Sequence, residues 1–231
     1  MEKQLYVSVV INTYNRAKSL KVTLESLCHQ TDSNFEVVVV NGPSTDETEE
    51  VVAAYGEKIK LISCPVRNLS VSRNMGIEAS AGDIVAFIDD DAIADANWIR
   101  DLIAGYDDID VGGVGGLVYD HTGMQLQYRY SACDRKGDTD FSILPPFERY
   151  CIPGGEKFLY LQGTNCSFRK TCLEEIGGFD EEFEYYLDEV DVCMRIIDLG
   201  YKIKPLDNAI VHHKYMKSFL RNEAKVVLHP Y

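Results

Sequence analysis

The chain has no long apolar run, few basic residues relative to acidic ones, and no paired cysteine motif. No stretch approaches the roughly 18 apolar residues of a membrane span, and Met1 to Gln4 lead into a predicted strand without a signal peptide. The 23 basic and 37 acidic residues leave a formal charge of −14, which argues against a general nucleic-acid binder. The seven cysteines are scattered, as reduced core thiols are. We therefore expect an acidic, cytoplasmic protein.

β-rich and amphipathic segments alternate in the first half of the chain. Apolar, β-branched runs predict strands at residues 5–11, 35–40, 59–64, 84–88 and 111–118. Helices are predicted at residues 19–30, 46–55 and 70–80, and from residue 95 onward. Alternating units of this kind predict an α/β, doubly wound, Rossmann-like sheet that binds its ligands beyond the carboxyl ends of the strands.

The second half follows a different pattern. Residues 119–160 show no lasting periodicity, which predicts a functional flap, an insertion or a partly disordered loop. A helix is predicted at residues 188–199 and a strand at residues 209–211. We expect one domain with residues 1–118 and 119–231 as its halves, and the lack of a clear terminating element favours a piece of a longer protein. A basic stretch near the end predicts peripheral association with a membrane surface, through Lys214, Lys217, Arg221 and Lys225.

Three consecutive carboxylates, Asp89, Asp90 and Asp91, follow the apolar run at residues 84–88. Carboxylates this close repel one another unless a cation joins them. Asp89 and Asp91 point the same way on an extended chain, with Asp90 facing away, and oxygen ligands suit Mg²⁺ or Mn²⁺. The triplet therefore predicts a metal site, and the alternative is an acidic loop that caps a helix.

Two polar turns follow the first two predicted strands. Residues 12–16 contain Thr13, Asn15 and Arg16, and residues 41–46 begin with Asn41. Polar side chains and a guanidinium before a helix N-terminus can hold the base and phosphates of a nucleotide, or they can simply cap the turn. The P-loop pattern is absent. Arg73, on the helix that precedes the triplet, can place a cation near a diphosphate or lie on a solvated face.

A second acidic group begins the predicted helix at residues 188–199. Asp188 and Glu189 are either capping carboxylates or, in a cleft, groups with a raised pKa suited to a general base. His212 and His213 follow the predicted strand at residues 209–211. Neutral imidazole is a common metal ligand, but neighbours on a strand face opposite ways, so at most one of the two should reach the site.

Taken in order, these segments resemble the family 2 inverting nucleotide-sugar glycosyltransferases, which have the glycosyltransferase A fold. Residues 7–16 resemble that family's first strand and turn, residues 41–46 its second-strand loop, and residues 73–76 its central helix. Residues 89–91 look like its DxD motif, and residues 163–169 and 177–180 match the segment before its catalytic helix. Residues 188–195 resemble that helix and its acidic pair.

The resemblance implies a role for each matched residue. The nucleotide pocket would be lined by Thr13, Asn15, Arg16, Asn41, Arg73, Asp89 and Asp90. Asp91 and Asp89 would bind Mn²⁺ or Mg²⁺, with His212 or His213 completing the site. Glu189 would be the base that activates the acceptor hydroxyl. Asn41 stands where the family commonly has Asp, and the order Asp188-Glu189 reverses the usual pair, so Asp188 is the alternative base.

The expected partners are a UDP-, GDP- or dTDP-sugar donor and a sugar, lipid-linked or protein acceptor. The stretch at residues 119–160 is the candidate acceptor site because aromatic rings stack on sugar faces. The predicted acceptor-side residues are Tyr128, Tyr130, Arg149 and Asn165. The alternatives are a nucleotidyltransferase that makes a nucleotide sugar, which the missing Gly-rich basic loop disfavours, and a non-catalytic nucleotide- or sugar-binding module.

Overall fold

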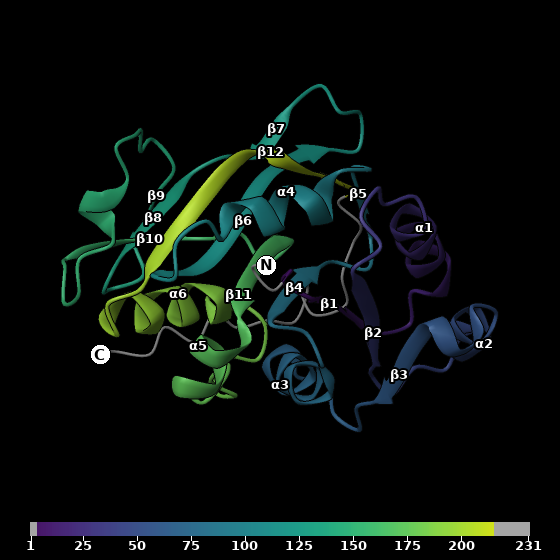
Figure 1. Ribbon diagram of the computed structural model, residues 1–231. Helices are drawn as coiled ribbons and strands as arrows, with labels where there is room; N and C mark the ends of the chain where they lie inside the picture. Colours follow the sequence, from purple (N-terminus) through teal and green to yellow (C-terminus); the bar gives the residue numbers. More distant parts are fainter. Residues whose placement is uncertain (1–3, 215–231) are drawn as a thin grey trace.

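A mixed β-sheet forms the centre of the computed structural model, which describes residues 4–214 (Figure 1). Within that range, nine strands form this sheet in the order β3-β2-β1-β4-β11-β6-β12-β5, and β7 pairs with β6. The strands of the first half are β1 (Val7–Thr13), β2 (Phe35–Asn41), β3 (Ile59–Ser63), β4 (Ile84–Ile88), β5 (Ala92–Ala94) and β6 (Val111–Asp120). Those of the second half are β7 (Leu126–Tyr128), β11 (Asn165–Arg169) and β12 (Lys202–His213). The predicted α/β, doubly wound mixed sheet is confirmed.

Helices cover both faces of the sheet and build one core on each. One face carries α1 (Ala17–Leu27), α2 (Thr48–Ala53) and α4 (Trp98–Gly105). The core on this face includes Leu20 of α1 and Trp98 and Leu102 of α4. The other carries α3 (Leu69–Ala79), α5 (Lys170–Glu175) and α6 (Asp188–Asp198), which pack around Phe87 and Phe168. Two short 3₁₀ helices complete the elements, η1 (Gly56–Lys58) and η2 (Glu148–Tyr150).

The two halves of the chain interleave in the middle of the sheet. β11, from the second half, pairs antiparallel with β4 on one side and with β6 on the other. β12 then runs parallel to β6. As a result β1, β4, β6 and β12 all end at the same edge, and β11 begins there. Residues far apart in the sequence, at positions 13, 89, 164 and 213, are thereby brought to one edge.

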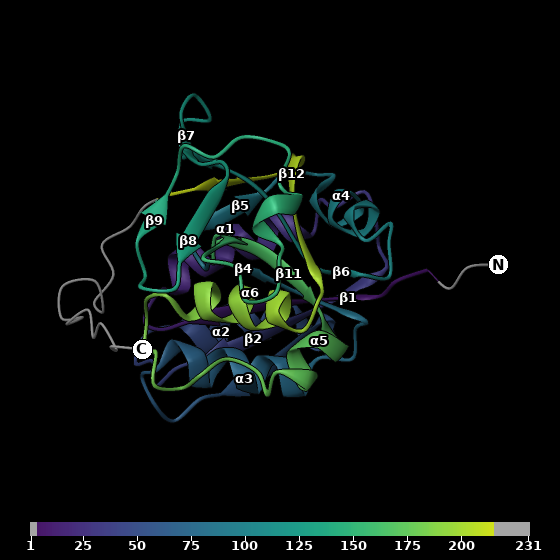
Figure 2. The same ribbon diagram turned by 90° about the vertical axis from the view of Figure 1, so that its left-hand side faces the viewer.

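Residues 119–160 form an ordered insertion. After β7, the strands β8 (Ser131–Asp134), β9 (Thr139–Asp140) and β10 (Lys157–Tyr160) make a small antiparallel sheet in the order β10-β8-β9. Phe158 and Tyr160 bury their side chains in the same core as α6, so this small sheet packs against that helix (Figure 2). The weak periodicity of this stretch reflects strands of two to four residues, too short to show an alternating pattern.

Candidate functional site

A pocket opens at the edge where the parallel strands end. Side chains from the ends of β1, β4 and β12, from α3, from the turn before β11 and from the start of α6 surround it. It is lined by Asn12, Thr13, Tyr14, Arg16, Gly42, Pro43, Val66, Arg67, Asn68, Leu69, Ser72, Arg73, Asp89, Asp90, Asp91, Tyr128, Gln162, Gly163, Thr164, Tyr185, Tyr186, Asp188, Glu189 and His213. The edge is where a doubly wound sheet binds its ligands.

Each carboxylate of the acidic triplet accepts at least one hydrogen bond, and Asp90 and Asp91 share Arg16. Asp89 accepts a hydrogen bond from the Thr164 hydroxyl at 2.7 Å. Asp90 accepts from Thr13 Oγ1 at 2.7 Å and from Arg16 Nη1 at 2.9 Å. The same Arg16 nitrogen lies 2.8 Å from Asp91 Oδ2.

The expectation that Asp90 faces away from the site is wrong, because Asp90 lines the pocket and bonds to two residues of the first turn. Burial raises the pKa of Asp90 to about 7, although Arg16 counteracts this.

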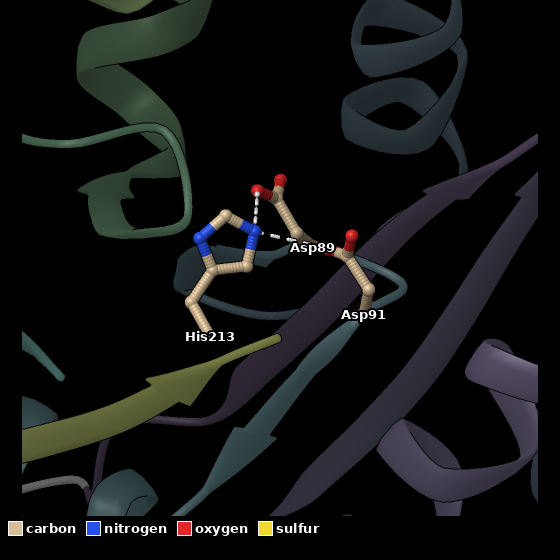
Figure 3. Close-up of side chains that lie close together, drawn as sticks. All are labelled: Asp89, Asp91 and His213. Atoms are coloured by element: carbon tan, nitrogen blue, oxygen red, sulfur yellow. Dashed lines mark hydrogen bonds and ion pairs between the residues drawn. The ribbon is translucent and has the colours of Figure 1, made fainter. Parts of the chain in front are cut away.

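Asp89, Asp91 and His213 offer three ligand atoms that lie within 4.8 Å of one another (Figure 3). His213 Nε2 is 3.1 Å from Asp91 Oδ1 and 3.6 Å from Asp89 Oδ2, and the imidazole is buried. Two carboxylate oxygens and one imidazole nitrogen are hard to borderline donors, which suit a small divalent ion such as Mn²⁺ or Mg²⁺. The side chains present therefore fit a divalent metal.

His212 lies outside this group, on the opposite side of β12. Its Nε2 is 3.3 Å from Asp95 Oδ1, and its ring stacks on Tyr119 with 5.8 Å between centroids. The alternation of side chains along a strand separates the two histidines. His213 is the one that faces the acidic triplet.

The two acidic residues that begin α6 have different surroundings. Asp188 is buried, and its Oδ2 pairs with Arg73 Nη1. The other oxygen, Oδ1, has no hydrogen-bond partner among residues 4–214. The Glu189 side chain is 18% exposed at the pocket and lies 4.0 Å from Arg73. Burial and the neighbouring Asp188 carboxylate raise the pKa of Glu189. Both line the pocket, and Glu189 is the more exposed of the two.

Arg73 is enclosed beside this acidic pair. Its guanidinium carbon lies 5.5 Å from the Phe87 ring centre and 5.0 Å from that of Phe179. A β-carbon on Gly163 would lie 2.7 Å from Arg73 Nη2, so a larger residue there would displace the guanidinium from its present position. Arg73 lines the pocket and forms an ion pair with Asp188.

Two predicted nucleotide-binding residues shape turns and do not line the pocket. Asn15 is exposed, and its Oδ1 accepts the backbone N–H of Thr45 at 2.7 Å. Asn41 is buried, and its Oδ1 accepts from Ser44 Oγ at 2.7 Å. Both bonds stabilise the turn after β2, the capping alternative considered for these residues.

Among the predicted acceptor residues, Tyr128 alone lines the pocket. Asn165 cannot touch a ligand, because its side chain is fully buried and bonds to Trp98, Leu117 and Ala209. This corrects its assignment to the acceptor side.

Tyr130 and Arg149 also lie outside the pocket. The Tyr130 hydroxyl donates to Asp207, and Arg149 Nη2 donates to the carbonyl of Leu144 at 3.3 Å. Both side chains help to hold the insertion in place.

Several lining residues were not predicted from the sequence. Tyr14 and Arg67 form a pair, with the guanidinium carbon 5.1 Å from the ring centre. Tyr185 and Tyr186 pack edge to face, 4.7 Å between centroids, just before α6. An aromatic pair directly upstream of two carboxylates is a sequence signal that could have identified these tyrosines. Gln162 and Thr164 precede β11 and carry no such signal.

Within the described part of the chain, no helix is both long and apolar enough to span a membrane. The predicted basic stretch begins at Lys214, and the rest of it, Lys217, Arg221 and Lys225, lies outside the described residues.

Comparison with known proteins gives consistent results. The family model described as glycosyl transferase family 2 matches residues 8–177. A glucosyl-dolichyl phosphate glucuronosyltransferase of Haloferax volcanii is 30% identical over 228 residues, which cover 90% of this chain and 69% of that protein. A chondroitin synthase of Escherichia coli is 26% identical over 92% of this chain, which spans 35% of that protein.

Two solved structures share the fold at lower identity. The mannosyltransferase PcManGT of Pyrobaculum calidifontis, in complex with GDP-Man and Mn²⁺, superposes with a TM-score of 0.74 at 20% identity over 96% of this chain and 60% of that one. S. aureus TarS 1-349 in complex with UDP-GlcNAc superposes with a TM-score of 0.71 at 22% identity, over 96% of this chain and 62% of that one. The fold is that of the glycosyltransferase A class, and the chain belongs to glycosyl transferase family 2.

Proposed function

We propose that the protein is an inverting, metal-assisted glycosyltransferase that moves a sugar from a nucleoside-diphosphate sugar to an acceptor hydroxyl. The observation that carries the proposal is one pocket shared by two groups: the Asp89, Asp91 and His213 cluster, and Glu189. A transferase needs the first to hold a leaving diphosphate and the second to activate an acceptor.

The donor lies on the side of the pocket formed by the first turn and the triplet. Thr13 and Arg16 hold Asp90 there, and Asn12 and Tyr14 line the same wall. Asp89, Asp91 and His213 would hold Mn²⁺ or Mg²⁺, which when bound supplies positive charge to the departing diphosphate. PcManGT was solved with GDP-Man and Mn²⁺, and TarS with UDP-GlcNAc, which supports donors of this class.

Glu189 is the proposed base, rather than Asp188. Its carboxylate takes the proton of the acceptor hydroxyl, whose oxygen forms a bond to the anomeric carbon. The bond from that carbon to the diphosphate breaks, and its electron pair leaves with the diphosphate. Attack from the face opposite the leaving group inverts the anomeric configuration. Asp188, buried and paired with Arg73, is the less accessible carboxylate.

The acceptor enters beside the aromatic side chains at the pocket mouth, Tyr128, Tyr185 and Tyr186. Their rings offer flat apolar surfaces for a sugar face. The H. volcanii relative is a glucosyl-dolichyl phosphate glucuronosyltransferase, which supports a lipid-linked sugar as the first acceptor to assay. A cytoplasmic location, with peripheral association at a membrane, fits such an acceptor.

The test is Glu189→Gln, which keeps the size of the side chain and removes its basicity. Wild-type protein is incubated with Mn²⁺ and a panel of UDP-, GDP- and dTDP-sugars, and donor binding and slow donor hydrolysis are measured. We expect wild type to bind and hydrolyse one donor, and Glu189→Gln to bind it with nearly the same affinity and lose roughly 100-fold or more of the turnover. Retained turnover would refute Glu189 as the base.

The same assay separates the alternatives. A non-catalytic binding module would bind the donor without turning it over in either variant. A nucleotidyltransferase would form a nucleotide sugar from a nucleoside triphosphate and a sugar phosphate. These two substrates are therefore tested together in a further reaction of the same assay. Glu47→Gln, an exposed residue before α2, is the matched control and should behave as wild type.

A further inference from the structure

We propose that Gln127 is a positioning residue for the metal site, which orients His213 so that the lone pair of Nε2 faces Asp89 and Asp91. The inference rests on the proposed function, because it concerns the metal that this function requires. Gln127 lies on β7, the strand that folds back on β6 at the start of the insertion. Neither the neighbouring sequence nor the family resemblance indicated a role for Gln127.

Both ends of the Gln127 amide contact His213. Its Nε2 donates to the backbone carbonyl of His213 at 3.4 Å, and its Oε1 lies 2.9 Å from His213 Nδ1. The first bond orients the amide so that its oxygen, and not its NH₂ group, meets the ring. A carboxamide oxygen only accepts hydrogen bonds, so Nδ1 must carry the hydrogen. In the neutral ring, Nε2 is then the nitrogen that carries the lone pair in the ring plane.

This tautomer determines how Nε2, on the other side of the ring, interacts with Asp89 and Asp91. His213 Nε2 is 3.1 Å from Asp91 Oδ1 and 3.6 Å from Asp89 Oδ2 (Figure 3). A lone pair that faces two carboxylate oxygens at these distances is repelled by them unless a cation lies between the three atoms. Gln127 therefore converts a histidine among carboxylates into a ligand, as partners of the second ring nitrogen do at metal sites.

The competing explanation is structural. Gln127 would then only tie β7 to the end of β12, and His213 would carry protons on both nitrogens as an imidazolium between two carboxylates. The two explanations differ in the protonation of Nε2 and in what Gln127→Leu does to metal binding.

The experiment measures Mn²⁺ binding to the whole chain from the loss of the free-ion electron paramagnetic resonance signal, at pH 8. Gln127→Leu removes the acceptor, Gln127→Glu keeps an oxygen at the same place, and Gln125→Leu is the matched control on the exposed part of the same hairpin. We expect Gln127→Leu to weaken Mn²⁺ binding by about 10-fold or more. Gln127→Glu and Gln125→Leu should remain within a few-fold of wild type.

A second readout does not depend on the substitutions. In wild-type protein saturated with Mg²⁺, the ¹⁵N chemical shifts of His213 should show a protonated Nδ1 and an unprotonated Nε2. A proton on Nε2 in the Mg²⁺-saturated protein would overturn the inference, as would unchanged Mn²⁺ binding in folded Gln127→Leu, with folding checked by circular dichroism. If wild type itself binds no Mn²⁺ with or without donor, the metal-assisted function fails, which is a different result.

Discussion

At the scale of single residues, two neighbouring carboxylates have different surroundings. Both line the pocket, but Asp188 is buried and paired with Arg73, whereas the Glu189 side chain is 18% exposed. The two carboxylates repel each other, and Asp188 has the closer cationic partner. Glu189 therefore resists losing its proton, and burial together with Asp188 raises its pKa. A base of raised pKa holds the acceptor's proton more readily once it has been transferred.

This arrangement predicts the pH dependence of Asp188→Asn. The base works in its deprotonated form, so wild-type kcat/KM should fall as the pH drops below the raised pKa of Glu189. In Asp188→Asn the repulsion between the two carboxylates is removed, and Glu189 becomes the only carboxylate of the pair that Arg73 stabilises. The pKa of Glu189 should therefore decrease. The acid limb of kcat/KM should then move to lower pH by about one unit. Donor hydrolysis measured between pH 5 and pH 9 checks this shift. An acid limb at the same pH in both proteins would contradict the interaction between Asp188 and Glu189.

At the scale of elements, the glycines of β6 allow two other strands to approach. Residues 112, 113, 115 and 116 are glycines, although glycine weakens a strand. A β-carbon on Gly116 would lie 1.7 Å from the carbonyl oxygen of Ala209 on β12, and one on Gly115 would lie 2.6 Å from that of Asn165. The contacts are with backbone, which cannot rotate away. The close approach holds the end of β12, and with it His213, beside the acidic triplet.

Gly116→Ala should therefore destabilise the fold. We expect the free energy of unfolding to decrease by about 2 kcal/mol or more, because β12 must shift to make room. Gly155→Ala is the control: its nearest new contact is 3.0 Å away, in the loop before β10, and it should cost less. Urea unfolding followed by circular dichroism measures both. Equal stability of Gly116→Ala and wild type would mean that β12 is not held there.

At the scale of the whole molecule, strands from the two halves of the chain pair with one another in the central sheet. β4, which carries the acidic triplet at its end, is bonded along one edge to β11, with Asn165 opposite Ile88. β6 pairs with β11 and β12, which both come from the second half. The fully buried Asn165 amide joins these strands to α4 by accepting from the Trp98 indole and donating to Leu117 and Ala209.

A fragment of residues 1–118 should accordingly fail to fold alone. It would expose both edges of β6 and one edge of β4, together with the apolar face that α5 and α6 cover. We expect a poorly dispersed proton NMR spectrum and no cooperative thermal transition, whereas the full chain shows both. A fragment that melts cooperatively would show that the two halves are independent domains.

How far the sequence predicts the site depends on the range of the interaction. The acidic triplet, Arg16, Arg73 and the pair at the start of α6 are recognisable because each follows a local pattern of strand end or helix start. The assignment of Asn165 to the acceptor side fails because its side chain bonds to partners 44 to 67 residues away in the sequence. Tyr130 likewise bonds to a residue 77 positions away, which no local pattern indicates. A polar side chain looks the same in the sequence whether it binds a ligand or a buried carbonyl.

The sequence by itself determined the alternation of strands and helices, the order of the motifs and the family. These depend on periodicity and spacing along the chain, which short-range sterics and burial impose. Only the tertiary structure decided that His213 and not His212 joins Asp89 and Asp91, that Asp90 turns toward Arg16, and that Gln127 contacts the imidazole. The physical reason is that each choice depends on strand register, and register is set by the packing of the whole sheet.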